Sequence, residues 1–366
     1  MSTAISISKT RKLLLAILVI CLGAPAVAAP QNGNLPPLVI KSQGSFFAGG
    51  AVLTQPGTFD PTSSAPVGQT LYGDHTYVQY QIPNGNPRKY PLVMWHGGGQ
   101  SGKSWESTVD GREGYQSIFL RRDFPVYIID QPRRGRAGNT TVGQNLIPTP
   151  SDESLFVAWR LGLYPPTLYP GSQFPPGADA LNQFYRQMTP DTGPGNNAVV
   201  VPGVVAAFEK IGPSVLLTHS ASGLPGWLTG IASPNVKGIY AYEPTGYVFP
   251  TGSVPPPMGG IAGTEVSMSD FLKLTKIPIV IEYSDHIPAA DQPSPYPRVE
   301  NWRIRMIFGR QMAKLINDNG GDATIVHLPE LGIYGNTHFS YADLNNIQIA
   351  DLLSQWLKEK GLDARN

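Results

Sequence analysis

Short apolar runs alternate along the chain with segments whose apolar residues are spaced three and four apart. The runs have the length of buried strands and the other segments that of helices, so their order predicts a mainly parallel sheet covered by helices on both faces. The expected strands are Thr76 to Ile82, Pro91 to Trp95, Val126 to Asp130, Ser214 to Thr218, Val236 to Tyr242, Ile277 to Tyr283 and Thr324 to Leu328. The expected helices are Val204 to Ile211, Leu224 to Ile231, Glu300 to Asn317 and Leu344 to Lys360.

The alternation stops between Gln144 and Pro202, where proline, tyrosine and glycine are frequent. A loop this long inside a compact domain is usually functional or disordered, and we expect a cap insertion at about 144–202. Its aromatic residues suit an apolar substrate pocket, and a proline-rich surface segment without substrate contact is the alternative. A second such segment, Phe249 to Gly263, is expected to be a plain loop.

The beginning of the chain has the pattern of an export signal. Basic residues precede the apolar run Leu13 to Leu22, and the small-residue stretch Ala24 to Ala29 follows it. A membrane span needs about 20 apolar residues, and this run is shorter. We therefore expect a signal peptide at 1–28, cleaved after Ala28, and a single mature domain at 29–366 without a membrane span. That domain is expected in the periplasm or the medium.

Charge and cysteine content narrow the function further. Charged residues make up 14% of the chain and the formal net charge is +1, so no basic field is available to hold nucleic acid. The one cysteine, Cys21, lies inside the expected signal peptide, so the mature chain has no disulfide and no thiolate nucleophile or metal ligand. A small-molecule substrate is the expected partner, and the oligomeric state stays open, a dimer included.

A candidate nucleophile follows the strand predicted to end at Thr218. The segment Thr218-His219-Ser220-Ala221-Ser222 stands between this strand and a predicted helix, which is the context of a nucleophile elbow. The usual motif is G-x-S-x-G, and Thr218 and Ser222 occupy its glycine positions; both are small, as the close approach of helix and strand requires. A serine at such a place is also a common helix N-cap.

A second segment, His96-Gly97-Gly98-Gly99, follows another predicted strand. Glycines there leave backbone N–H groups free to bind a developing oxyanion, together with the amide after the nucleophile, Ala221. We assign Gly98 as the second donor, with Gly97 and Gly99 as alternatives. An ordinary glycine-rich turn is the competing interpretation.

The candidate general base is His338, in a loop between the last predicted strand and the C-terminal helix. Folds with a nucleophile elbow place their catalytic histidine in such a loop. His286 is the strongest rival, but it follows the penultimate strand and so takes the position of the acid. The remaining histidines are assigned to the two motifs (His96, His219), to the region before them (His75) and to a strand (His327).

Two carboxylates are candidates for the acid that orients His338. Asp285 ends the strand where most α/β hydrolases keep this residue, and Glu243 ends the strand immediately after the elbow helix. Either carboxylate can fix the histidine tautomer and stabilise the imidazolium.

Together these segments resemble a group of secreted bacterial carboxylesterases within the α/β-hydrolase superfamily. The resemblance extends from about Ser45 onward and also rests on Ser104-Trp105-Glu106, Asp110-Gly111-Arg112, Phe119-Leu120-Arg121 and Ile129 to Arg136. It implies an α/β-hydrolase fold and places the acid at Glu243, with Asp285-His286 as a structural or pocket element. Related members can carry two adjacent cysteines in the oxyanion loop, where this chain has glycines.

The same glycines also match a phosphate-binding loop. Gly97 to Ser104 fits G-x-x-x-x-G-K-S, and Asp130 at the end of an apolar strand imitates a magnesium ligand. A true phosphate loop opens a long helix after its lysine, yet Asp110-Gly111 predicts a turn a few residues on. We therefore expect Ser101 and Ser104 to be polar loop residues, and Arg133, Arg134 and Arg136 to anchor a loop rather than hold a substrate carboxylate.

These features predict a serine esterase that acts through an acyl-enzyme on Ser220, without metal or organic cofactor. An amidase, a lactonase or an acyltransferase would use the same triad. A catalytically silent α/β hydrolase that serves as a binding protein is the alternative from another class.

Overall fold

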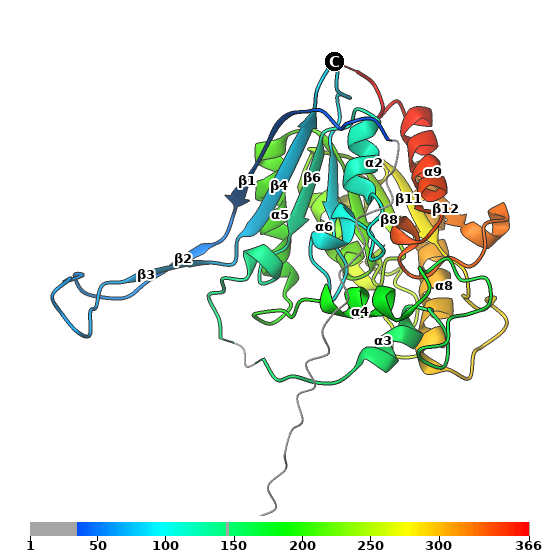
Figure 1. The fold of residues 1–366 in the computed structure, drawn as a ribbon, viewed down its shortest axis with the longest axis horizontal. Coiled ribbons are helices and arrows are strands. Elements are labelled where there is room, and N and C mark those ends of the chain that lie inside the picture. The colour runs from blue at the N-terminus through cyan, green and yellow to red at the C-terminus, as the bar shows by residue number, and fades with distance from the viewer. Residues whose placement is uncertain (1–34, 144–145, 366) are drawn as a thin grey trace, which may run out of the picture.

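The computed structural model describes residues 35–143 and 146–365, and the expected signal peptide lies outside them. A sheet of eight strands forms its centre (Figure 1). In sheet order the strands are β1 (Ile40–Ala48), β4 (Thr76–Pro83), β6 (Val126–Asp130), β5 (Leu92–Trp95), β7 (Ser214–His219), β8 (Val236–Tyr242), β11 (Pro278–Tyr283) and β12 (Asp322–His327). Within this sheet, β4 pairs antiparallel with both neighbours and the other pairs are parallel, which confirms the predicted mainly parallel sheet.

The predicted strands and helices are all present. The four predicted helices correspond to α5 (Asn197–Ile211), α6 (Gly223–Ala232), α8 (Pro297–Asp318) and α9 (Asn346–Glu359). Helix α5 begins well before the expected Val204, because the side chain of Asn196 caps it by accepting a hydrogen bond from Ala198 N at 2.8 Å.

Alternating side chains divide the core between the two faces of the sheet. Along β5, Leu92 and Met94 join one buried cluster, and Val93 and Trp95 join the other, as the two-residue period of a strand requires. The first face is covered by α1 (Lys103–Glu106), α2 (Tyr115–Arg121) and α9. The second is covered by α5, α6, α7 (Met268–Leu274) and α8.

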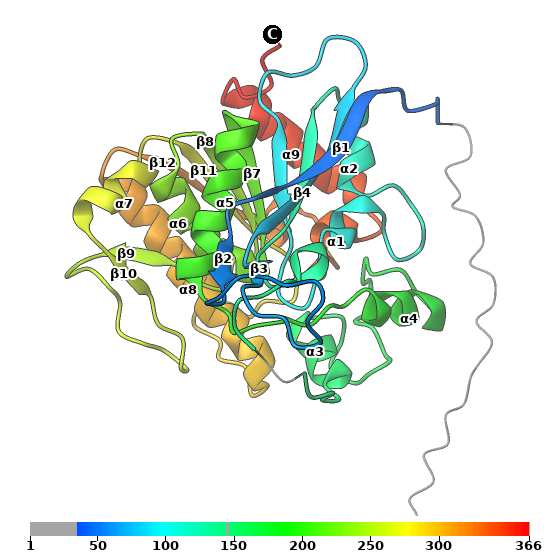
Figure 2. The same cartoon turned by 90° about the vertical axis from the view of Figure 1, so that its left-hand side faces the viewer.

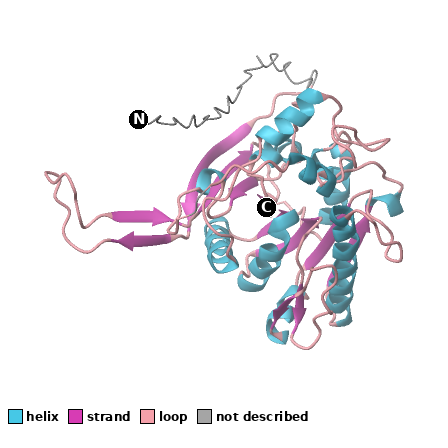
Figure 3. Cartoon of the chain, turned by 90° about the horizontal axis from the view of Figure 1, so that it is seen from below, coloured by secondary structure: helices cyan, strands magenta, loops and turns pink. Residues whose placement is uncertain are grey.

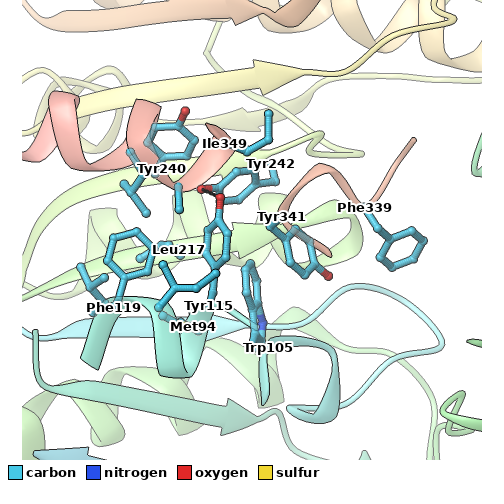
Figure 4. Close-up of a cluster of buried hydrophobic side chains, with 14 of the residues drawn as sticks. Met94, Trp105, Tyr115, Phe119, Leu217, Tyr240, Tyr242, Phe339, Tyr341 and Ile349 are labelled. Carbon is cyan, nitrogen blue, oxygen red and sulfur yellow. Dashed lines mark hydrogen bonds between the residues drawn. The ribbon is translucent and has the colours of Figure 1, made fainter. Parts of the chain in front are cut away.

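Aromatic side chains fill much of the first face, where strand residues meet those of the covering helices (Figure 4). The ring of Trp105 from α1 stacks on Tyr341 with centroids 4.0 Å apart, and Tyr115 from α2 meets Tyr242 of β8 edge to face. Because Tyr341 lies just beyond the loop that carries His338, this packing ties that loop to the core.

The segment before α5 forms α3 (Asp152–Ala158) and α4 (Ala178–Arg186), which lie at the lower end of the sheet (Figures 1 and 2). The aromatic side chains of Phe156, Phe174 and Phe184 are buried in the first core cluster. The segment therefore packs onto the core around the central sheet.

Smaller elements complete the described chain. Strands β9 (Val248–Pro250) and β10 (Thr264–Val266) form a parallel pair. The first two residues of the loop expected at Phe249 to Gly263 therefore belong to β9, and the rest of it connects the two strands. Strands β2 (Ala51–Thr54) and β3 (Thr70–Gly73) form a hairpin that projects from the body of the molecule (Figures 1 and 3). None of the helices within residues 35–143 and 146–365 combines the length and apolar character needed to cross a membrane.

Candidate active site

Ser220 lies at a sharp turn between β7 and α6 and has a positive φ of 54°. Such a conformation is strained for a residue with a side chain and persists only where its surroundings hold it. Ser222 supplies part of that support, because its Oγ accepts a hydrogen bond from His219 N at 2.8 Å and lies 3.1 Å from the carbonyl of Trp95.

The close approach of helix and strand at this turn uses glycines of the helix. A Cβ on Gly226 would lie 2.5 Å from the methyl group of Thr218, and a Cβ on Gly223 would lie 2.3 Å from Pro244. Thr218 is thus tolerated at a motif position that usually holds glycine because Gly226 makes room for its methyl group. The departure from G-x-S-x-G leaves the elbow geometry in place.

His338 lies in the loop before α9, with its ring almost fully buried. Its backbone N donates to Trp159 O at 3.0 Å, and its Nδ1 contacts Glu243 Oε2. Its Nε2 is buried without a hydrogen-bond partner among the described residues, and its side chain lines the same cavity as Ser220. In the described part of the chain, Ser220 and His338 are not joined by a hydrogen bond. This is common in enzymes without substrate, because catalytic hydrogen bonds often tighten only when the substrate binds.

Burial lowers the pKa of His338 below its ordinary value of 6.5, although the contact with Glu243 acts in the opposite direction. The imidazole is therefore neutral at neutral pH, which is the form that accepts a proton. A base in this state is available over the whole range above its lowered pKa.

Glu243 follows β8 directly and has a positive φ of 46°. Its Oε1 pairs with Arg160 and accepts a hydrogen bond from Ser284 N at 2.8 Å, and its Oε2 contacts His338. Burial acts to raise the pKa of Glu243, but Arg160, His338 and the Ser284 amide outweigh it and lower the pKa to about 2. The carboxylate is therefore ionised beside the histidine.

Asp285 has a different environment. Its Oδ1 accepts a hydrogen bond from His286 N at 2.6 Å, and its Oδ2 accepts one from Gly335 N at 2.7 Å. The carboxylate thus holds the loop that leads to His338 without contacting the imidazole. The ring of His286 stacks on Tyr169, with centroids 4.1 Å apart.

Three other histidines, His219, His96 and His327, contact backbone or loop groups. Nε2 of His219 lies 2.9 Å from the carbonyl of His338, so this buried ring packs under the catalytic loop. His96 contacts Gly97 O through Nδ1 at 2.9 Å, and His327 contacts Glu330 at 3.2 Å.

The glycine segment after β5 passes beside the nucleophile. A Cβ on Gly97 would lie 3.0 Å from Cβ of Ser220, and a Cβ on Gly98 would lie 3.4 Å from Cβ of Ala221. Gly98 and Ala221 line one cavity of about 260 Å³, and their amides donate no hydrogen bond to the described parts of the chain. Gly99 instead accepts a hydrogen bond from Thr189 N at 3.0 Å, so it joins this loop to the segment before α5.

The residues that match a phosphate-binding loop stabilise the local structure of the chain. The helix after Lys103, α1, has four residues rather than a long run, and Ser104 lies inside it. Asp130 accepts hydrogen bonds from Gly102 N at 2.6 Å and from Arg136 N at 2.9 Å, so its carboxylate closes the loop. The three nearby arginines form ion pairs, Arg133 with Asp74, Arg134 with Asp191 and Arg136 with Asp130.

Two parts of the site have no counterpart in the sequence motifs. Arg160, fully buried, pairs with Glu243 and donates from Nε to Asp285 O at 2.9 Å, although nothing in its segment marks it as functional. The second part is one face of α8 that lines the cavity beside Ser220. The sequence contains one sign of this face, a spacing of three and four residues within and just before a predicted helix. Such a spacing shows that the side chains share one helical face, but not which part of the protein that face contacts.

Comparison with known proteins sets this geometry in context. No family model matches the chain. The probable secreted lipase phiG of a fungal species (strain ATCC 74256) is 31% identical over 313 residues, which cover 78% of this chain and 86% of the lipase. The chain belongs to the α/β-hydrolase family of esterases and lipases. A solved structure of a novel bacterial esterase superposes on this α/β hydrolase with a TM-score of 0.73 at 28% identity, covering 89% of this chain and 98% of that one.

This membership confirms the resemblance and the fold predicted from the motifs, and it makes the protein a carboxylic ester hydrolase. The relative is a probable secreted lipase, which agrees with export of this chain.

The α/β hydrolase also buries a carboxyl group beneath its histidine loop. Glu282 of β11 accepts hydrogen bonds from Tyr240 Oη at 2.7 Å and from Ser340 Oγ at 2.8 Å. Burial raises the pKa of Glu282 to about 7, partly offset by these two donors. Because Ser340 stands two residues after His338, the charge of Glu282 bears on the stability of the catalytic loop.

We expect Glu282→Gln to remove part of the pH dependence of stability. The native pKa of about 7 lies above the ordinary 4.5, so native Glu282 holds its proton where the unfolded chain has lost it. Its contribution is complete below about pH 4.5 and is lost as the pH rises through about 7. The wild-type free energy of unfolding should therefore fall relative to that of the variant by up to about 3 kcal/mol. Urea denaturation at about pH 5 and about pH 8 measures this change; a difference that does not vary with pH would contradict the raised pKa.

Proposed function

We propose that Ser220, His338 and Glu243 form the catalytic triad of this ester hydrolase. The observation that carries the proposal is the arrangement around His338. Its Nδ1 contacts the ionised Glu243, and its buried Nε2 has no partner among the described residues and borders the cavity that Ser220 lines. In space, the histidine thus stands between the nucleophile and the orienting acid, as in the triad of a serine hydrolase.

In the first step His338 takes the proton of Ser220, and the serine oxygen attacks the ester carbonyl. The charge that develops on the carbonyl oxygen is bound by the free amides of Gly98 and Ala221, while Glu243 stabilises the imidazolium. The imidazolium then protonates the leaving alcohol. The acyl group stays on the serine.

In the second step water enters with His338 again as the base and attacks the acyl-enzyme. The tetrahedral intermediate uses the same amides, and its collapse releases the acid and returns the proton to Ser220. This sequence consumes one water for each ester and needs no cofactor. The substrate of this reaction is a carboxylic ester that is small enough to enter the cavity between α8 and the segment that carries Trp159.

Two further assignments belong to the proposal. The segment at about 144–202 acts as a cap, which its contribution of Ala158 and Trp159 to the catalytic cavity supports. The mature protein works outside the cytoplasm, in the periplasm or the medium, after removal of residues 1–28; the secreted relative supports this location.

A labelling experiment tests the nucleophile directly. Purified mature protein is assayed on p-nitrophenyl esters of short and medium chain length, with and without a serine-reactive phosphonate. We expect inhibition to advance in step with labelling, and mass spectrometry to place one phosphonyl group on Ser220. Hydrolysis that persists after complete labelling of Ser220, or a label on another serine, would reject the assignment. Neither hydrolysis nor label would favour a silent hydrolase that serves in binding.

A further inference from the structure

One face of α8 forms a wall of the catalytic cavity. The cavity has a volume of about 140 Å³ and is bordered by Ser220, Thr245 and His338 on the side of the sheet. The residues of α8 that line it are Arg298, Asn301, Trp302 and Arg305. Steps of three and four residues put these side chains on one helical face. The wall opposite the nucleophile is thus cationic.

The two arginines in this wall have no carboxylate within 4.0 Å in the described parts of the chain. The helix carries two other arginines, on its remaining surface, and these do form ion pairs. They are Arg303 with Glu300 and Arg310 with Glu330. The arginines of α8 therefore differ according to whether they face the cavity.

Arg305 is the more enclosed of the two. Its guanidinium lies 4.7 Å from the centroid of the Trp302 ring, and its Nε is buried without a hydrogen-bond acceptor among the described residues. Burial lowers the pKa of Arg305 from its ordinary value. Arg305 as a whole is partly buried, and a partly desolvated guanidinium without an acceptor is stabilised by an anion that completes its surroundings.

The chain itself does not supply that anion. Glu243 is the carboxylate that acts on Arg305, but it already contacts both Arg160 and His338. No carboxylate lines the cavity among the described residues. An anion that pairs with Arg305 therefore has to enter from outside the chain, through the cavity that Ser220 also lines.

We propose that this cavity binds a carboxylate carried by the ester substrate, held mainly by Arg305 with Arg298 at the exposed end. The inference rests on the function proposed above and names its substrate class, an anionic ester. The two oxygens of a carboxylate match the parallel N–H groups of a guanidinium, so one planar pair fixes the orientation of the ester. The larger cavity beside Gly98 takes the other part of the substrate.

The carboxylate has two possible places in such an ester. It stands on the acyl part, as in a monoester of a dicarboxylic acid, or on the leaving alcohol, as in an ester of a hydroxy acid. Two matched pairs of esters distinguish these sources. The acyl pair is the mono-p-nitrophenyl ester of glutaric acid and its neutral isostere with isopropyl in place of carboxylate. The alcohol pair is the butyrate of m-hydroxybenzoate and that of m-isopropylphenol.

The measured quantity is the ratio of kcat/KM for the anionic ester to that for its neutral partner, after subtraction of the rate in buffer. We expect wild-type protein to favour the anionic member of one pair by about 10- to 100-fold, the worth of a hydrogen bond between charged groups. Arg305→Met should bring this ratio close to one, and Arg305→Lys should restore part of it. Arg298→Met, at an exposed position, should lower the ratio by about threefold because solvent screens its charge.

Arg310→Met is the matched control, since this arginine lies on the same helix, is exposed and pairs with Glu330 away from the cavity. It should leave the ratio at the wild-type value. Inhibition of neutral-ester hydrolysis by free glutarate in the wild-type protein gives a second measurement that needs no variant. Stronger inhibition than by the same concentration of chloride is expected.

The outcomes separate this inference from the proposed function. Hydrolysis of both members of each pair at equal rates, with Ser220 labelled, would overturn the carboxylate site and leave the esterase assignment standing. No hydrolysis and no label would reject the esterase assignment itself. An equal loss on both esters in Arg305→Met, with a shifted acid limb of the pH profile, would mean that Arg305 acts through His338, and the proposal would be wrong.

Discussion

Replacing Ser220 by alanine is expected to lower kcat on p-nitrophenyl esters by about five to six orders of magnitude, the loss that follows removal of a triad nucleophile. Without the hydroxyl no acyl-enzyme forms, and His338 is left without the proton it is placed to take. Any remaining rate would come from water attack aided by the free amides of Gly98 and Ala221. Initial rates on the purified variant, with thermal unfolding as a check of folding, measure the effect.

Ser101→Ala is the matched control for this variant. Ser101 belongs to the segment that fits a phosphate-binding loop, and its Oγ lies 3.4 Å from Lys103 N rather than in the catalytic cavity. The substitution should leave esterase activity within about twofold of wild type, because a single surface hydroxyl contributes little. A large loss in Ser101→Ala together with a small one in Ser220→Ala would reverse the assignment of the nucleophile.

The strands that sequence predicts best are the ones buried on both faces. The bounds predicted for β6 and β8 agree with the structure at both ends, because most residues of each strand are apolar and buried. Strand β1 escaped prediction since it lies at the edge of the sheet and most of its residues are at least partly exposed. The exposed hairpin β2–β3 was not predicted either; its strands contain apolar residues such as Val52 and Leu71, but each is only four residues long.

The choice of acid shows where local sequence is insufficient. Glu243 and Asp285 both stand at the ends of neighbouring parallel strands, so each is carried to the same edge of the sheet. The sequence alone left them equal, and the resemblance favoured Glu243. In three dimensions the difference is one of partners: Glu243 reaches His338, while Asp285 is occupied by two loop amides.

The charges around the triad escaped sequence reasoning for a related cause. Arg160 comes from the segment before α5, and Arg305 from the middle of a helix far along the chain, and neither lies in a motif. By contrast, Arg133, Arg134 and Arg136 stand next to a strand end, and their ion pairs agree with the predicted role of anchoring a loop. Proximity to a motif along the chain is a weaker guide than the path of the backbone, which sequence periodicity does not give.

Glu243→Gln is expected to lower kcat by about 10⁴-fold, by analogy with the loss that follows the same change in a triad aspartate. It should also lower the free energy of unfolding, because buried Arg160 loses its anionic partner. The amide oxygen can keep the bonds to Arg160 and the Ser284 amide, which leaves the amide NH₂ facing Nδ1 of His338. That contact favours the tautomer with its proton on Nε2, which cannot take the proton of Ser220. The measurement is kcat and KM on the same ester, beside a thermal unfolding curve that reports the buried Arg160.

Asp285→Asn is the control that decides between the two acids. An asparagine oxygen can accept the hydrogen bond from only one of the two loop amides, so we expect a modest loss of stability and less than about tenfold loss of kcat. If Asp285→Asn instead lost activity by four orders of magnitude and Glu243→Gln did not, Asp285 would be the acid. In that case the loop before His338 would have to move in the enzyme with substrate, because Asp285 would need to release Gly335 before it reached the imidazole.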